Sequence, residues 1–104
     1  MARYDVYAHP DAALRKVTPF LLDVQNEYID SLDTRVVIPM RAAALYRHPI
    51  RDLNPVFDVS GKSVVLDTAA LAAFPARELK KRVAGLQDQS EYIVAAIDCL
   101  FGAY

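Results

Sequence analysis

The chain has 104 residues, a length that fits a single domain spanning residues 1–104. Its hydrophobic content of 54% excludes a disordered chain, and its net charge of −1 lacks the electrostatic signature of a protein that binds nucleic acid or a membrane surface directly. One cysteine excludes an internal disulfide and suits a reducing compartment, and no apolar run approaches the ~20 residues of a membrane span. The first residues lack the apolar core of a secretory signal, so we expect a cytoplasmic protein.

The first part of the chain predicts three short strands. Residues 3–8 alternate and are rich in Tyr and Val, which places Tyr4 and Val6 on one face. Residues 20–25 and 34–40 are aliphatic and β-branched runs separated by Asp, Asn and Ser, the pattern of two strands joined by a turn region.

The middle of the chain predicts a helical stretch and a hairpin. Residues 41–47 are rich in Ala and favour about two helical turns before Pro49 ends them. Residues 56–59 and 63–68 then read as a β-hairpin, in which Gly61 supplies the positive φ of a tight turn.

The last third predicts helices after one short extended piece at residues 74–75. Residues 77–84 favour a turn or two of helix, which Gly85 interrupts. A terminal helix is expected from about Asp88 or Gln87, since Glu91 lies three residues beyond Asp88 as in a helix N-terminus.

An apolar stripe runs along this terminal helix, formed by Ile93, Ile97, Leu100 and Phe101. So broad a surface needs partners on two sides, and we expect the chain's own sheet on one and a second copy on the other. Several short strands without βαβ alternation predict a mainly β fold: a small antiparallel sheet or barrel carrying a C-terminal helix.

The residues that could carry chemistry form no catalytic or metal cluster. His9 and His48 each precede a proline, which predicts exposed positions at element ends, and Cys99 is expected to be a buried, inert thiol. The carboxylates between residues 23 and 33 predict a polar turn bonded to the backbone rather than a Mg²⁺ site. The basic run at residues 80–82 predicts a solvated helix face. We therefore predict no enzyme activity and no cofactor, and expect binding to a macromolecule.

Five sequence blocks resemble the CcdB family of bacterial toxins, which act on DNA gyrase. Their order and spacing are similar to the family's over nearly the whole chain. The blocks are Tyr4-Asp5-Val6-Tyr7, Asp23-Val24-Gln25 with Ile29-Asp30, Arg35-Val36-Val37-Ile38-Pro39, Leu53-Asn54-Pro55-Val56 and Ala96-Ile97-Asp98.

This resemblance implies an SH3-like barrel of the CcdB and Kid toxin type, with antiparallel strands and a C-terminal helix. It implies a homodimer that acts as the toxin of a type II toxin–antitoxin module, binds the DNA gyrase A subunit and poisons the topoisomerase. A cognate CcdA-like antitoxin would neutralise it.

The resemblance also implies positions that face gyrase. Two residues after the Asp-Val-Gln block fall on Tyr28 and Ile29, a polar position late in the helix falls on Asp98, and an aromatic position falls on Phe101. The family's terminal tripeptide is typically Trp-Gly-Ile or Thr-Gly-Ile.

The tail of this chain departs from that pattern. It reads Gly102, Ala103 and Tyr104, so the bulky residue has moved from the first of the three positions to the last. Aromatic anchors often dominate interface energies, so this change bears on toxicity.

Two alternatives stay open. A CcdB-like protein could dimerise and bind antitoxin without poisoning its host. A MazF- or Kid-like endoribonuclease would share the barrel, but it needs a base, an acid and a cation around a phosphate, and we find no such set. The resemblance also leaves open gyrase against topoisomerase IV, and the identity of the antitoxin.

Overall fold

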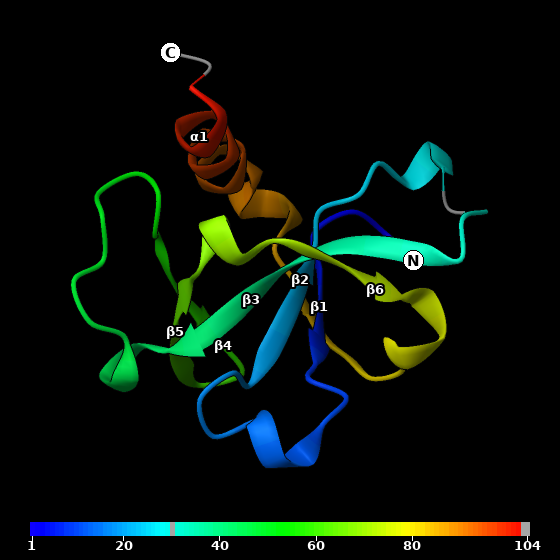
Figure 1. Ribbon diagram of the computed structural model, residues 1–104, viewed down its shortest axis with the longest axis horizontal. Coiled ribbons are helices and arrows are strands. Elements are labelled where there is room, and N and C mark those ends of the chain that lie inside the picture. The colour runs from blue at the N-terminus through cyan, green and yellow to red at the C-terminus, as the bar shows by residue number, and fades with distance from the viewer. Residues whose placement is uncertain (30, 103–104) are drawn as a thin grey trace.

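The computed structural model describes residues 1–29 and 31–102 and shows a bent antiparallel sheet with one α-helix against it (Figure 1). The strands run in the order β4-β5-β3-β2-β1-β7, and β6 pairs with β3 off this path. Their bounds are β1 Asp5–Ala8, β2 Phe20–Asp23, β3 Thr34–Ala42, β4 Val56–Val59, β5 Lys62–Leu66, β6 Ala72–Pro75 and β7 Arg82–Gly85, and α1 spans Ser90–Phe101. The predicted fold class, antiparallel β with a C-terminal helix, is confirmed.

One face of the central strands carries the main core. Val6 of β1 lies opposite Leu22 of β2, which lies opposite Ile38 of β3, and all three are completely buried. Ile93 and Ala96 of α1 belong to the same cluster. Burying each aliphatic side chain of this size stabilises the fold by about 1.5–3 kcal/mol, so this layer fixes where α1 lies.

The other face of these strands is unusually polar for a buried surface. A small apolar cluster formed by Tyr7, Leu21, Val37 and Leu79 lies there. Odd-numbered positions of the same strands and their immediate continuations add buried polar side chains, namely Asp5, His9, Asp23, Gln25 and Arg35. Such groups need internal partners, because an unpaired buried polar group is costly.

The hairpin between β4 and β5 forms as predicted. Val59 pairs with Lys62, and the two residues between them, Ser60 and Gly61, have φ angles of 50° and 79°. Two consecutive positive φ angles are typical of a tight hairpin turn, whose twist matches that of the flanking strands.

The predicted helix at residues 41–47 is wrong. Strand β3 continues to Ala42, and only one short 3₁₀ turn, Ala43–Leu45, follows. Arg41 and Ala42 pair with Val65 and Val64 of β5, and this ladder outweighs a local helix preference of a few tenths of a kcal/mol per residue.

The predicted helix at residues 77–84 is also wrong. A 3₁₀ turn, Ala76–Glu78, is followed by strand β7, which pairs with β1 and begins at Arg82, so the basic run at residues 80–82 is not helical. Arg82 and Gln87 both donate hydrogen bonds to Asp5 Oδ1, at 2.9 and 3.0 Å. Burial alone would raise the pKa of the Asp5 carboxyl, but these bonds hold it below the ordinary 3.8.

The terminal helical segment begins where predicted, because a 3₁₀ turn, Gln87–Gln89, leads directly into α1. The N-cap positions of the turn and of α1 are Leu86 and Gln89, and neither makes a side-chain capping bond, so the predicted cap at Asp88 or Gln87 is wrong. Glu91 still lies in the first turn, where a negative charge complements the helix dipole. Within the described part of the chain, no helix is long and apolar enough to cross a membrane.

Candidate functional site

The connection between β2 and β3 presents apolar side chains to solvent. A single 3₁₀ turn, Glu27–Ile29, carries Tyr28 and Ile29, with exposures of 90% and 47%. Asn26 shapes this turn, because its Oδ1 accepts a hydrogen bond from the Tyr28 N–H at 3.0 Å. Asp30, part of one family block, lies outside the described residues.

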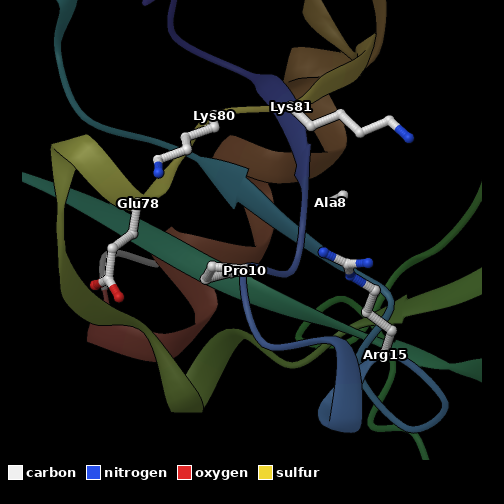
Figure 2. A pocket seen from close by; sticks show the side chains of 6 residues that line it. All are labelled: Ala8, Pro10, Arg15, Glu78, Lys80 and Lys81. Atoms are coloured by element: carbon white, nitrogen blue, oxygen red, sulfur yellow. The ribbon is translucent and has the colours of Figure 1, made fainter.

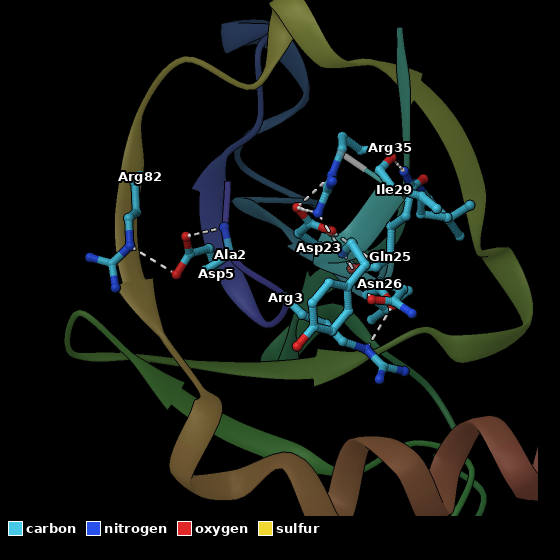
Figure 3. A network of polar contacts seen from close by, with 12 residues as sticks. Ala2, Arg3, Asp5, Asp23, Gln25, Asn26, Ile29, Arg35 and Arg82 are labelled. Carbon is cyan, nitrogen blue, oxygen red and sulfur yellow. Dashed lines mark hydrogen bonds and ion pairs between the residues drawn. The ribbon is translucent and has the colours of Figure 1, made fainter. Parts of the chain in front are cut away.

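A buried ion pair lies at the base of this connection (Figure 3). Arg35 Nε and Nη2 both contact Asp23 Oδ2, at 2.9 and 2.8 Å, and both side chains are completely buried. Burial raises the pKa of the Asp23 carboxyl above its ordinary 3.8, although the Arg35 guanidinium opposes the rise. Asp23 Oδ1 also accepts the backbone N–H of Gln25, at 3.0 Å. The carboxylates between residues 23 and 33 therefore do not all belong to a polar turn, because Asp23 is paired with Arg35 in the interior.

The end of α1 presents the second group of candidate residues. Ile93 and Ala96 face the core, Asp98 is half-buried, and Phe101 at the last helical position is 69% exposed. Gly102 follows with a φ of 72° and donates its N–H to the Asp98 carbonyl. This left-handed cap favours glycine, so Gly102 has a structural role in ending the helix, whatever its role toward a partner.

The structure brings the candidate residues into two groups rather than one. Tyr28 and Ile29 are neighbours on the cyan connection, and Asp98, Phe101 and Gly102 are neighbours at the red end of α1. Figure 1 shows the cyan connection and the helix end at separate points on the same upper side of the molecule. The predicted contacts Ala103 and Tyr104 lie outside the described residues.

The histidine and cysteine predictions need correction. His9 is only 7% exposed, its Nδ1 accepts the Asp11 N–H at 3.0 Å, and its ring meets Phe74 edge to face. Burial lowers the pKa of His9 below 6.5. His48 is exposed as predicted, and Cys99 is half-buried rather than buried.

A cavity of about 280 Å³ lies away from both groups, between the β1–β2 connection and the segment before β7 (Figure 2). Its lining includes Arg15, Lys80, Lys81 and Glu78. Figure 2 shows Glu78 across from Arg15, with Pro10 between them, so the carboxylate and the guanidinium do not converge on one point. Among the described residues, no group of three or more His, Cys, Asp or Glu side chains could hold a metal ion.

Sequence reasoning missed two features. Tyr92 of α1 is 55% exposed, which extends the apolar surface of the helix beyond the predicted stripe. The pairing of Asp23 with Arg35 was also missed. Its signal was an arginine inside an otherwise apolar strand, in the same alternation phase as the aspartate of the neighbouring strand.

Comparison with known proteins identifies the family. A family model described as CcdB protein matches residues 3–102 of the 104-residue chain. The match covers every strand, α1 and both groups of candidate residues up to Gly102. The chain therefore belongs to the CcdB protein family.

Proposed function

We propose that this chain is the toxin of a type II toxin–antitoxin module, and that it binds the A subunit of DNA gyrase and poisons the topoisomerase. A cognate CcdA-like antitoxin neutralises it. The toxin works in the cytoplasm by binding, with no cofactor and no catalytic step of its own. Membership of the CcdB family over residues 3–102 is the observation that carries this proposal.

The exposed apolar residues support the proposal. Phe101, Tyr28 and Ile29 are large side chains held in water at 69%, 90% and 47% exposure. Aromatic residues that become buried at an interface are frequent hot spots, and each can contribute 2 kcal/mol or more to binding. Gly102, Ala103 and Tyr104 continue from this end of α1 and complete the proposed gyrase-binding set together with Asp98.

A homodimer accounts for the separation of the two groups in one chain. A two-fold contact that includes the exposed face of α1 repeats each group twice and presents two Phe101 side chains to a target that is itself two-fold. Val94, seven residues before Phe101 and on the same side of α1, is an exposed apolar residue available for such a contact.

The test is a gyrase cleavage assay with purified toxin, combined with growth of a host that expresses it. We expect growth arrest and accumulation of gyrase-cleaved plasmid, both reversed by co-expressed antitoxin. Supercoiling that continues unaffected at micromolar toxin, with no cleaved complex, would refute the proposal. The same assay on topoisomerase IV identifies the preferred enzyme.

Two further outcomes decide between the alternatives. Antitoxin binding and dimer formation without growth arrest would identify a CcdB-like protein that has lost toxicity. Specific cleavage of total RNA would identify an endoribonuclease. Deletion of Tyr104 tests whether the terminal ring replaces the family's tail aromatic, because we expect weaker arrest from the deleted chain.

A further inference from the structure

Gln25 connects the loop that carries Tyr28 and Ile29 to strand β3. Its Oε1 accepts the Val36 N–H at 3.0 Å, and its Nε2 donates to the Ile29 carbonyl at 3.2 Å. One buried amide side chain, 7% exposed, therefore holds the end of the exposed turn to the sheet.

The buried ion pair holds Gln25 itself. Asp23 Oδ1 accepts the Gln25 N–H at 3.0 Å, and Arg35 Nη2 lies 3.4 Å from the Gln25 carbonyl oxygen. Figure 3 shows Asp23, Arg35, Gln25 and Ile29 as one connected group. The backbone of Gln25 is thus bonded on both sides by charged groups that have no contact with solvent.

Apolar packing contributes little to the position of the turn. The Tyr28 side chain is almost fully exposed and Ile29 is half exposed, so neither is held by the core. Within the turn, the bonds from the Tyr28 and Ile29 N–H groups both go to Asn26, which fixes its shape but not its place on the sheet. The position of the turn on the sheet therefore depends on Gln25 and on the ion pair of Asp23 and Arg35 that holds it.

A buried ion pair is weak evidence for stability, because well-packed apolar residues can replace such pairs at no loss. Arg35 Nη1 is buried and has no hydrogen-bond partner among the described residues, so the pair is also incompletely satisfied. Its role at this position is better explained by geometry, since it holds Gln25, and Gln25 holds the turn.

We propose that Gln25, held by Asp23 and Arg35, is a positioning residue that fixes Tyr28 and Ile29 in advance for docking onto the topoisomerase. This inference rests on the proposed function and adds residues that do not touch the partner. A turn that is already ordered loses less conformational freedom on binding, so the partner binds more tightly.

The test compares Gln25→Met with Gln87→Met. Both changes keep the length of the side chain and remove an amide that donates to a backbone carbonyl, but Gln87 bonds to the Arg3 carbonyl and Asp5 rather than to the turn. We expect Gln25→Met to speed amide hydrogen exchange at Val36 and Ile29 at least tenfold. Exchange at Leu22 and Ile38 in the β2–β3 ladder should stay as in wild type.

Binding to the purified gyrase A subunit supplies the second measurement. We expect Gln25→Met to weaken binding about tenfold, equivalent to about 1.4 kcal/mol, and Gln87→Met to leave binding unchanged. Gln25→Glu keeps an acceptor for the Val36 N–H, but it replaces the donor to Ile29 with a carboxylate oxygen and adds a negative charge. It should therefore leave Val36 protected while Ile29 exchanges faster, which keeps the test valid if the methionine variant folds poorly.

The outcomes separate the two proposals. Unchanged exchange at Ile29 in both Gln25 variants, or faster exchange with wild-type affinity for the A subunit, would overturn the positioning role. Failure of the wild-type protein to bind the A subunit would instead overturn the proposed function, and the exchange data would still show whether Gln25 fixes the turn.

Discussion

Replacing Arg35 with methionine tests how the polar interior is held. The change removes two contacts to Asp23 Oδ2, at 2.9 and 2.8 Å, and leaves a completely buried carboxylate without its cation. Breaking a buried pair in this way costs about 3–5 kcal/mol. For a domain whose stability is about 5–15 kcal/mol, that is a large share of the total.

The double variant Asp23→Leu with Arg35→Met should behave differently. It removes both charges, fills the space with apolar atoms, and leaves the Gln25 N–H without its acceptor and the Gln25 carbonyl without its donor. We expect its free energy of unfolding to stay within about 1–2 kcal/mol of the wild-type value, because removing both ions also removes the cost of burying them. Arg41→Met is the control in a less buried site, where Arg41 pairs with Asp67 at 3.0 Å and donates to Thr18 Oγ1 at 2.6 Å; water reaches both charges of this pair, so we expect a smaller loss than from Arg35→Met.

Urea unfolding followed by far-ultraviolet circular dichroism measures all three variants on one scale, with thermal unfolding as a check. The single variant should lower Tm by more than about 10 °C, since 1 kcal/mol shifts Tm by about 4–8 °C in a domain of this size. A loss below about 1 kcal/mol for Arg35→Met, or equal losses for the single and double variants, would refute the reasoning that an unpaired buried charge dominates.

Three further changes give distinct expected results. Phe101→Ala should keep the free energy of unfolding within about 0.5 kcal/mol of wild type, because the ring is exposed. It should weaken binding to the gyrase A subunit by about 2 kcal/mol or more in calorimetry, and Leu45→Ala, at a similar exposure on a distant loop, is the control. The pKa of His9 is lowered by burial, so the stability that its neutral form provides should be lost as pH falls below about 6.5. In His9→Gln, the urea midpoint should therefore depend less on pH between about pH 7.5 and 5.5, and a pH dependence equal to that of wild type would contradict this. Gly61→Ala should cost about 1–2 kcal/mol in urea unfolding, since a φ of 79° is strained for alanine even with open space around the added carbon, and no loss would show that the turn relaxes.

The elements that could be predicted from the sequence were those specified by nearby residues. The runs at residues 20–25 and 34–40, and the hairpin around Gly61, combine period-two alternation with local turn residues. Strand β7 could not be predicted in this way. Its residues, Arg-Val-Ala-Gly, have no strong local preference, and they become a strand because β1 offers an edge to pair with.

The candidate site was predictable only in part, for a similar reason. The resemblance supplied Tyr28, Ile29 and Phe101, and the structure places all three at exposed positions. The burial of His9 was not foreseeable, because the residue that covers its ring, Phe74, comes from a distant part of the chain. The role of Gly102 as a helix cap has a signal in the sequence, because a glycine directly after the last apolar residue of a helix commonly ends it, and its φ of 72° agrees with that role.

The pairing of β1 with β7 has a consequence for synthesis of the protein. The bond from Arg82 to Asp5 closes a loop of 77 positions along the chain, so the first strand gains its second neighbour only after most of the chain has been made. Closing so distant a contact is slow compared with local pairing. A nascent chain on the ribosome therefore has an incomplete sheet and no helix end to present. Its host meets the finished binding surface only after β7 and α1 have been made.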